Sequence, residues 1–167
     1  MEELPKINTI TKPQKVKLPN GSEYVIEELF VYKKFPCVIV LYKMGHRCGY
    51  AGIPNFHPLY GKTWDNIEIK NLEVHGGITY NEQADQFPIP STNGYWLGFD
   101  CAHAGDKKDF ESAYKYWNDK HLDLLKEMEE RFSTSGTIRT QEFVKEELIK
   151  LIEQLENMLT KEIPNES

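Results

Sequence analysis

The chain has 167 residues, of which 40% are hydrophobic and 12% aromatic, and it carries a formal net charge of −6. This length can bury one hydrophobic core but not two independent ones, so we expect a single domain over residues 1–167. The negative charge argues against general nucleic-acid binding and against a membrane role, because either would need a basic patch acting against the overall field.

Cysteine usage and the N-terminal residues indicate the compartment. The three cysteines, Cys37, Cys48 and Cys101, are an odd number without a repeated spacing, which argues against a disulfide framework and for a reducing environment. Residues 1–13 contain no apolar stretch typical of a secretion signal, and no apolar run reaches the roughly 18 residues that span a membrane. We therefore expect a cytoplasmic protein.

Glycine and proline divide the chain into two parts. Residues 1–106 contain 10 of the 11 glycines and 8 of the 9 prolines, whereas residues 107–167 contain one of each. Turns therefore belong to the first part and helices to the second. The predicted fold class is α+β: a mainly antiparallel sheet in the turn-rich N-terminal part, packed by two C-terminal helices.

Several strands are predicted in the first part. The Asn20-Gly21 pair predicts a hairpin turn between two strands, because both residues tolerate positive φ angles. Residues 37–42 form an apolar run typical of a buried central strand, and residues 94–99 predict a short aromatic strand. Alternating apolar positions in residues 66–80 predict a kinked strand, and the polar residues 81–94 predict a loop that could cover a site.

Two helices are predicted in the second part. The first extends from Lys107 to Phe132 and the second from about Thr140 to Leu159, because apolar residues recur there at spacings of three and four. The expected apolar stripes are Phe110, Tyr114, Trp117, His121, Leu124, Leu125 and Met128 in the first helix, and Val144, Leu148, Leu151, Leu155 and Met158 in the second. We interpret both stripes as packing on the sheet; a dimer interface can coexist with that.

Chemistry-bearing residues cluster in the middle of the chain. Four of the five histidines and two of the three cysteines lie between residues 46 and 103. Residues 44–62 place His46, Arg47, Cys48, His57, Tyr60 and Lys62 among glycines and prolines. This composition predicts irregular backbone, and loops held on a rigid scaffold often contact ligands.

A metal centre is one hypothesis for this cluster. His75, His103 and His57, with Asp100 or Asp106, supply nitrogen and oxygen ligands suited to zinc, iron or manganese. No pair has a recognised ligand spacing, so no metal is expected, and zinc or manganese on His75, His103 and Asp100 is kept as the alternative.

A thiol nucleophile is a second hypothesis. Cys101 could be activated by His103 or His75, with Asp100 orienting the imidazole. Two residues apart on a strand, Cys101 and His103 are expected on one face. The competing interpretation is that Cys101 fills space in the core.

A pocket for a nucleotide-like anion is the third hypothesis. His75-Gly76-Gly77 and the residues around His103 provide backbone N–H groups that can approach a phosphate, with cationic candidates at Arg47, Lys62, Lys107 and Lys108. Aromatic residues that could stack on a base are Tyr50, Phe56, Tyr60, Tyr80, Tyr95 and Trp96. In the competing interpretation, both histidines belong to the core and Asp100 or Asp106 caps the following helix.

Three ordered motifs carry a resemblance to a known family. "RCGYAGIPNFHPLYGK", "VHGGITY" and "YWLGFDCAHAGD", followed by "TIRTQEFVKEELIKLIEQL", resemble a family of small proteins encoded in bacteriophages and prophages. The resemblance covers roughly residues 35–156 and assigns no residue roles. By context it implies similarity to phage proteins that counter host immunity by capturing or degrading nucleotide second messengers.

These observations lead to one functional hypothesis with two alternatives. We expect a phage protein that binds and sequesters a nucleotide-derived immune signal, such as a cyclic oligonucleotide or an ADP-ribose derivative. The expected ligand-binding residues are His75, Gly76, Gly77, Asp100, His103, Asp106, Arg47, His57, Tyr60 and Lys62. The first alternative is a hydrolase of such a ligand that uses a metal or Cys101, with His103 and Asp100 as further catalytic candidates, so turnover stays open.

The second alternative is an inhibitor that binds a host protein through acidic helical positions. Those positions are Glu127, Glu129, Glu130, Glu142, Glu146 and Glu147. Association of copies through the C-terminal helices would assist sequestration but is not required for it.

Overall fold

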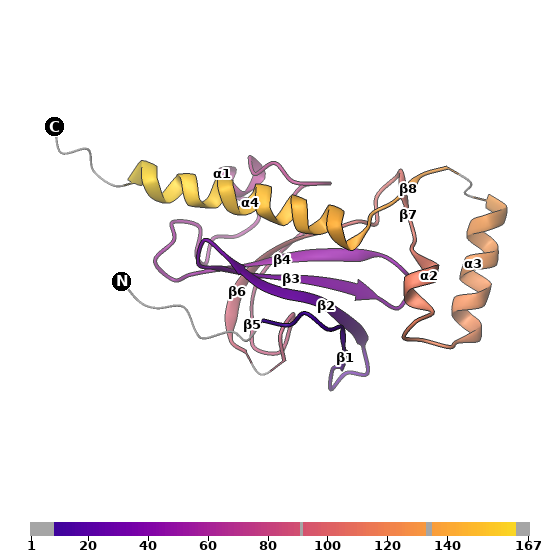
Figure 1. Cartoon of the computed structure of the whole chain (residues 1–167). Coiled ribbons are helices and arrows are strands. Elements are labelled where there is room, and N and C mark those ends of the chain that lie inside the picture. The colour runs from indigo at the N-terminus through magenta and orange to yellow at the C-terminus, as the bar shows by residue number, and fades with distance from the viewer. Residues whose placement is uncertain (1–8, 91, 133–134, 163–167) are drawn as a thin grey trace.

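A six-stranded antiparallel sheet forms the body of the protein in the computed structural model, which describes residues 9–90, 92–132 and 135–162. The strand order is β1-β2-β3-β4-β6-β5 (Figure 1). The strands are β1 (Gln14–Lys17), β2 (Glu23–Tyr32), β3 (Phe35–Tyr42), β4 (Arg47–Ile53), β5 (Tyr80–Ala84) and β6 (Gly94–Asp100). The predicted α+β class with a mainly antiparallel sheet is confirmed.

Helices follow mainly in the C-terminal part of the chain. They are α1 (Ile67–Lys70), α2 (Phe110–Ala113), α3 (Lys120–Phe132) and α4 (Gln141–Glu162), and a short parallel pair joins β7 (Asp106–Lys107) to β8 (Thr137–Ile138). Within the described ranges, every helix is too short or too polar to cross a bilayer.

The predicted hairpin at Asn20-Gly21 is confirmed between β1 and β2. Gly21 has φ +91°, and the Leu18 N–H donates to the Ser22 carbonyl across the turn. A side chain at this φ would be strained, which explains why the turn uses glycine.

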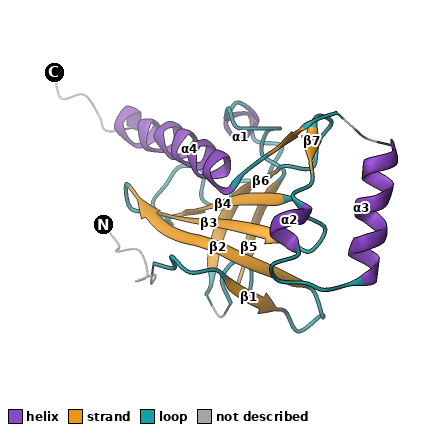
Figure 2. Cartoon of the chain, turned by 45° about the vertical axis from the view of Figure 1, so that its right-hand side comes forward, coloured by secondary structure: helices purple, strands orange, loops and turns teal. Residues whose placement is uncertain are grey.

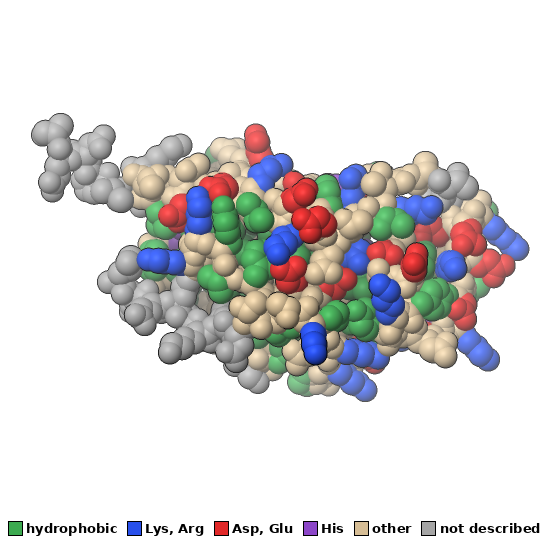
Figure 3. All heavy atoms as spheres, viewed as in Figure 1, with side chains coloured by type: hydrophobic (Ala, Val, Ile, Leu, Met, Phe, Trp, Pro, Cys, Tyr) green, Lys and Arg blue, Asp and Glu red, His purple; other side chains and the backbone are tan. Residues whose placement is uncertain are grey.

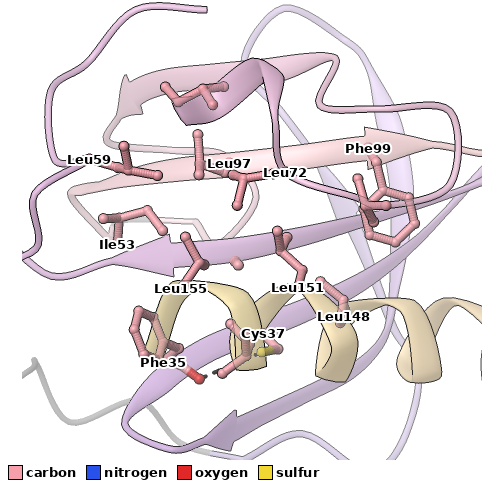
Figure 4. Close-up of a cluster of buried hydrophobic side chains, with 14 of the residues drawn as sticks. Phe35, Cys37, Ile53, Leu59, Leu72, Leu97, Phe99, Leu148, Leu151 and Leu155 are labelled. Carbon is pink, nitrogen blue, oxygen red and sulfur yellow. Dashed lines mark hydrogen bonds between the residues drawn. The ribbon is translucent and has the colours of Figure 1, made fainter. Parts of the chain in front are cut away.

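The helix α4 covers one face of the sheet, which we call the helix face (Figure 1). The side chains of Val144, Leu148, Leu151 and Leu155 are 0% exposed, so the predicted stripe is buried as expected up to Leu155. In Figure 4, Leu148, Leu151 and Leu155 lie against side chains of the strands beneath. The second predicted helix is therefore confirmed, and it packs on β3 and β4.

The opposite face of the sheet is concave. The ring of Phe87 contacts one tyrosine from each of β2, β3, β4 and β5, with ring centroids 5.0–6.5 Å apart. Those tyrosines are Tyr24, Tyr42, Tyr50 and Tyr80. One ring can contact four strands only if the sheet curls around it, so we call this side the concave face.

The first predicted helix is broken in two. Residues 107–132 contain α2 and α3 with a turn between them, and Asp119 starts α3 by accepting a hydrogen bond from the backbone N–H of His121. In α3 the buried side chain is that of Leu122, which packs with Val25 and Leu41. Leu122 was not part of the predicted apolar stripe. Leu124 is 53% exposed because α3 stands beside the end of the sheet instead of lying on it (Figure 2).

Three other local predictions were wrong. Residues 47–53, predicted as irregular, form β4, because Gly49 and Gly52 let the Phe99 and Pro36 side chains pack directly on the backbone. Residues 67–70 form α1 instead of a strand, because the Asn66 side chain caps the first turn. Residues 81–84, predicted as loop, pair with β6 as part of β5.

Candidate functional site

The structure brings His75 and His103 together, with ring centroids 6.0 Å apart. Asp106 links them: its carboxylate lies 2.9 Å from His75 Nε2 and accepts a 3.0 Å hydrogen bond from the backbone N–H of His103. The Arg139 Nε donates to the same carboxylate at 2.8 Å. Sequence analysis did not identify Arg139, which lies 33 residues away and is brought close by the β7–β8 pairing.

Asp106 is a structural carboxylate. Its side chain is 1% exposed. Burial alone would raise the pKa of Asp106, but hydrogen bonds from His75, Arg139 and the His103 backbone outweigh it and lower the pKa. Because protein groups occupy both oxygens, Asp106 is not open to a ligand; the predicted role of helix cap belongs to Asp109, which caps α2.

Gly76 allows the His103 ring to pack against the backbone. A Cβ on Gly76 would lie 2.2 Å from His103 Nε2, and the residue has φ +71°. The N–H of Gly77 donates to the Val74 carbonyl at 2.8 Å, which closes a turn. The two glycines therefore build a turn that supports His103.

Arg47 is a buried centre of hydrogen bonds, only 4% exposed. Its guanidinium binds both carboxylate oxygens of Glu27 at 2.6 and 3.0 Å and the Asp109 carboxylate at 2.8 Å. It also donates to the Arg139 carbonyl and the Ser112 hydroxyl. With its donors used inside the protein, Arg47 is not placed to bind a phosphate.

The later residues of the predicted loop, His57, Tyr60 and Lys62, lie away from the groove that His103 lines on the concave face, and the His57 ring packs edge-on against Phe35 of the helix face. His57 is buried, with Nδ1 accepting from the Leu59 N–H and Nε2 lying 2.9 Å from the Leu155 carbonyl, so it is a core histidine. Tyr60 and the backbone of Lys62 contact Gln83 and Asn81 of β5. This loop therefore does not close over His75 and His103.

Cys101 is a buried thiol. It is 3% exposed, and burial together with the nearby carboxylates of Asp106 and Asp100 raises its pKa to about 12. Because β6 ends at Asp100, Cys101 packs in the core beneath α4 while His103 borders the concave face, so the predicted shared face was wrong. A protonated, buried thiol is a poor nucleophile.

The metal hypothesis needs at least three ligand side chains around one point. Across residues 9–90, 92–132 and 135–162, no group of three or more His, Cys, Asp or Glu side chains is arranged to hold a metal ion. His57, one of the predicted ligands, lies in the core instead.

A groove of about 470 Å³ lies at one end of the concave face and is the candidate site. Its lining residues are Tyr42, His46, Cys48, Tyr50, Thr79, Tyr80, Phe99, Asp100, Ala102 and His103. Of the predicted ligand-binding residues, the groove therefore contains Asp100 and His103. Sequence analysis did not identify Tyr42 or Thr79. Alternation along β3 could have placed Tyr42 on the same face as Val38 and Val40, but not shown that this face is concave.

The walls of the groove are aromatic and polar at their tips. The hydroxyls of Tyr42 and Tyr50 lie 2.8 Å apart, and Tyr80 stands edge-on to Tyr50 at 5.3 Å. Burial raises the pKa of all three tyrosines, that of Tyr80 to about 12, so they stay neutral. The His46 ring stacks on Tyr42 at 5.0 Å, and burial lowers the pKa of His46, with Asp100 opposing and Lys108 adding to the effect.

Asp100 brings a negative charge to this groove. Its Oδ1 accepts from the Ala102 N–H at 3.1 Å and lies 3.1 Å from His103 Nε2, although no hydrogen bond of good geometry forms to that nitrogen. Among the described residues, Oδ2 accepts no hydrogen bond and no lysine or arginine lines the groove. The site thus combines aromatic walls with a carboxylate that lies 30% exposed.

In comparisons with known proteins, no family model, curated protein or solved structure matches the chain.

Proposed function

We propose that the protein binds a small nucleotide-derived immune signal and sequesters it, with the base of the ligand in the groove on the concave face. In this proposal the protein acts in a phage-infected bacterium, where capture of a cyclic oligonucleotide or an ADP-ribose derivative would blunt antiviral defence. The observation that carries the proposal is the groove itself, with tyrosine walls and the Asp100 carboxylate.

The size and lining of the groove support a planar aromatic ligand. Its volume of about 470 Å³ falls within the roughly 300–1,000 Å³ of small-molecule sites. Exposed aromatic side chains bind bases by stacking, worth about 1–3 kcal/mol per base. Tyr80 is half-buried at the edge of the sheet, so its ring can contact a ligand without unfolding the core.

The charges assign the base and the phosphates to different places. Asp100 repels phosphate, and the described lining of the groove has no lysine or arginine to oppose it. The phosphates of the ligand would therefore remain at the mouth of the groove. Lys108 acts electrostatically on His46, and we assign it the phosphate contact.

Binding is favoured over hydrolysis by the state of Cys101. A thiol nucleophile must ionise near neutral pH, whereas burial raises the pKa of Cys101 to about 12. On the face seen in Figure 3, acidic and basic side chains are interspersed along α3 and α4, which argues against an acidic docking surface on that face.

Association of copies, where it occurs, would use α3. The stripe of α4 is buried on the sheet, whereas Leu124, Met128 and Phe132 of α3 are 53%, 49% and 80% exposed. Light scattering after size-exclusion chromatography separates the 19.5 kDa monomer from a dimer. A dimer that persists in a Met128→Ser/Phe132→Ser variant would exclude α3 as the contact.

Native mass spectrometry of the purified protein with cyclic dinucleotides, ADP-ribose and mononucleotides tests the proposal. We expect a one-to-one complex that releases intact ligand on heating. Release of a hydrolysed product would replace sequestration by catalysis, and absence of any complex at millimolar ligand would overturn the proposal. A Tyr80→Ala variant should lose the complex, whereas the matched control Tyr32→Ala, at the far end of β2, should retain it.

A further inference from the structure

We infer that the groove selects a guanine base through the carboxylate of Asp100. This inference rests on the proposed function and names the ligand class of the same groove. It follows from the hydrogen-bonding groups that the groove offers and from the way in which the fold holds Asp100.

Two sequence motifs converge to hold the carboxylate in place. The Ala102 N–H binds Oδ1 of Asp100, and His103 Nε2 lies 3.1 Å from the same oxygen. His103 is in turn fixed by its backbone hydrogen bond to Asp106 and by the backbone of Gly76, on which its ring packs. The VHGGITY and GFDCAHAGD segments therefore position Asp100 without using its Oδ2.

No lysine or arginine in the described lining of the groove pairs with this charge, and His103 lies against Oδ1 and leaves Oδ2 open. Burial keeps His46 neutral by lowering its pKa. An ionised carboxylate only accepts hydrogen bonds and has about four acceptor sites on two oxygens. A ligand that covers Oδ2 must therefore present N–H or O–H donors to it, because a carboxylate oxygen buried without a donor is costly.

Guanine is the common base that meets this requirement best. Its N1–H and its exocyclic N2 amino group are adjacent donors on one edge, and they match the two oxygens of a carboxylate in a pair of parallel hydrogen bonds. Adenine and cytosine place a ring acceptor beside the amino group, and uracil places its N–H between two carbonyls. Each of these edges would turn an acceptor toward Asp100.

Isothermal titration calorimetry with GMP, IMP, AMP, CMP and UMP tests the inference. IMP keeps N1–H and lacks the N2 amino group, so it removes one of the two paired donors. We expect GMP to bind tightest, and Asp100→Asn to weaken GMP binding by roughly 5- to 150-fold, the range for a bidentate base contact. The control Asp85→Asn, exposed on the loop after β5, should leave GMP binding unchanged.

The outcomes separate the inference from the proposed function. If AMP or CMP binds as tightly as GMP, or if Asp100→Asn binds GMP like the wild type, the guanine inference fails and nucleotide binding stands. If no nucleotide binds, both fail. Should Asp100→Asn melt early, the wild-type comparison of GMP with IMP decides, since equal affinities overturn the inference. Agmatine, a cation without a base, completes the panel, and binding as tight as that of GMP would also overturn it.

Discussion

The two faces of the sheet are built for different tasks. On the helix face, aliphatic side chains from β3, β4 and α4 close the core completely, and Leu148 and Leu151 are 0% exposed. On the concave face, tyrosines lie among aliphatic residues such as Val38 and Val40, and the space beside the tyrosines stays open at one end. A helix-covered face gains stability from exclusion of water, whereas an open aromatic face keeps surface that a ligand can cover.

Alternation along β4 produces this difference within one strand. Gly49 and Ala51 face α4, and a Cβ on Gly49 would lie 2.7 Å from the Phe99 ring. Cys48 and Tyr50 face the other way and line the groove. Small residues thus let α4 approach closely on one side while a large tyrosine builds the wall on the other.

Replacing Arg47 by methionine should give the largest loss of stability. Arg47 lies at the end of β4 that borders the groove, and removing it leaves Glu27, with a side chain 6% exposed, as an uncompensated buried charge. We expect the free energy of unfolding to fall by about 3–5 kcal/mol in urea titrations at pH 7. In the control Arg131→Met, whose partner Glu127 is 61% exposed, the change should stay within about 0.5 kcal/mol. Equal losses in the two variants would contradict the structural role of Arg47.

Truncation of Leu151 tests the closed face directly. Leu151→Ala should lower the free energy of unfolding by about 2–5 kcal/mol, because the side chain is 0% exposed and leaves a cavity under α4. Ligand affinity, measured where the variant is still folded, should not change. A selective loss of affinity would mean that the two faces are coupled and that their separation is wrong.

The pattern of apolar residues predicted the helix face better than the concave face. The stripe from Val144 to Leu155 follows helical periodicity, so both α4 and its buried residues up to Leu155 were predictable. The break between α2 and α3 was not predictable, because Phe110 of α2, Trp117 of the connecting segment and Leu122 of α3 pack in one cluster. Their spacing along the chain therefore resembles the stripe of a single helix.

The candidate site was predicted only in part, for a geometric reason. His75 and His103 do lie together, as predicted. Arg47 and His57, in contrast, form hydrogen bonds with buried groups of the fold. Sequence composition cannot distinguish a polar residue with such a structural role from one that binds a ligand. The groove depends on the curl of the sheet, which brings Tyr42 and Tyr80 toward each other on one face although β4 and β6 separate their strands. Such curvature leaves no periodic pattern.

Gly76→Ala should disturb the concave side without touching the helix face. The new Cβ would lie 2.2 Å from His103 Nε2, and alanine is strained at φ +71°. We expect a loss of about 1–3 kcal/mol in unfolding free energy and weaker nucleotide binding, because His103 no longer supports Asp100. Gly77→Ala shares a positive φ, +79°, but meets no atom within 4 Å, so it should be destabilised without the loss of binding. Equal nucleotide affinity in the two variants would contradict the proposal that His103 positions Asp100.

The smallest expected effect is a pH dependence of the unfolding free energy, and it comes from His46 in the wall of the groove. Burial lowers the pKa of His46 below the ordinary 6.5, so as the pH falls below 6.5 the unfolded chain binds a proton before the folded protein does. His46 therefore makes the folded state lose stability as the pH falls, by at most about 1.4 kcal/mol per pH unit for one proton. Urea unfolding between pH 7 and pH 5 should show a shallower decline for His46→Gln than for the wild type. Ile67→Gln, at an exposed position on α1 that does not titrate, supplies the control and should keep the wild-type slope. Parallel slopes for all three proteins would mean that folding does not change the pKa of His46. The burial of its ring against Tyr42 would then be contradicted.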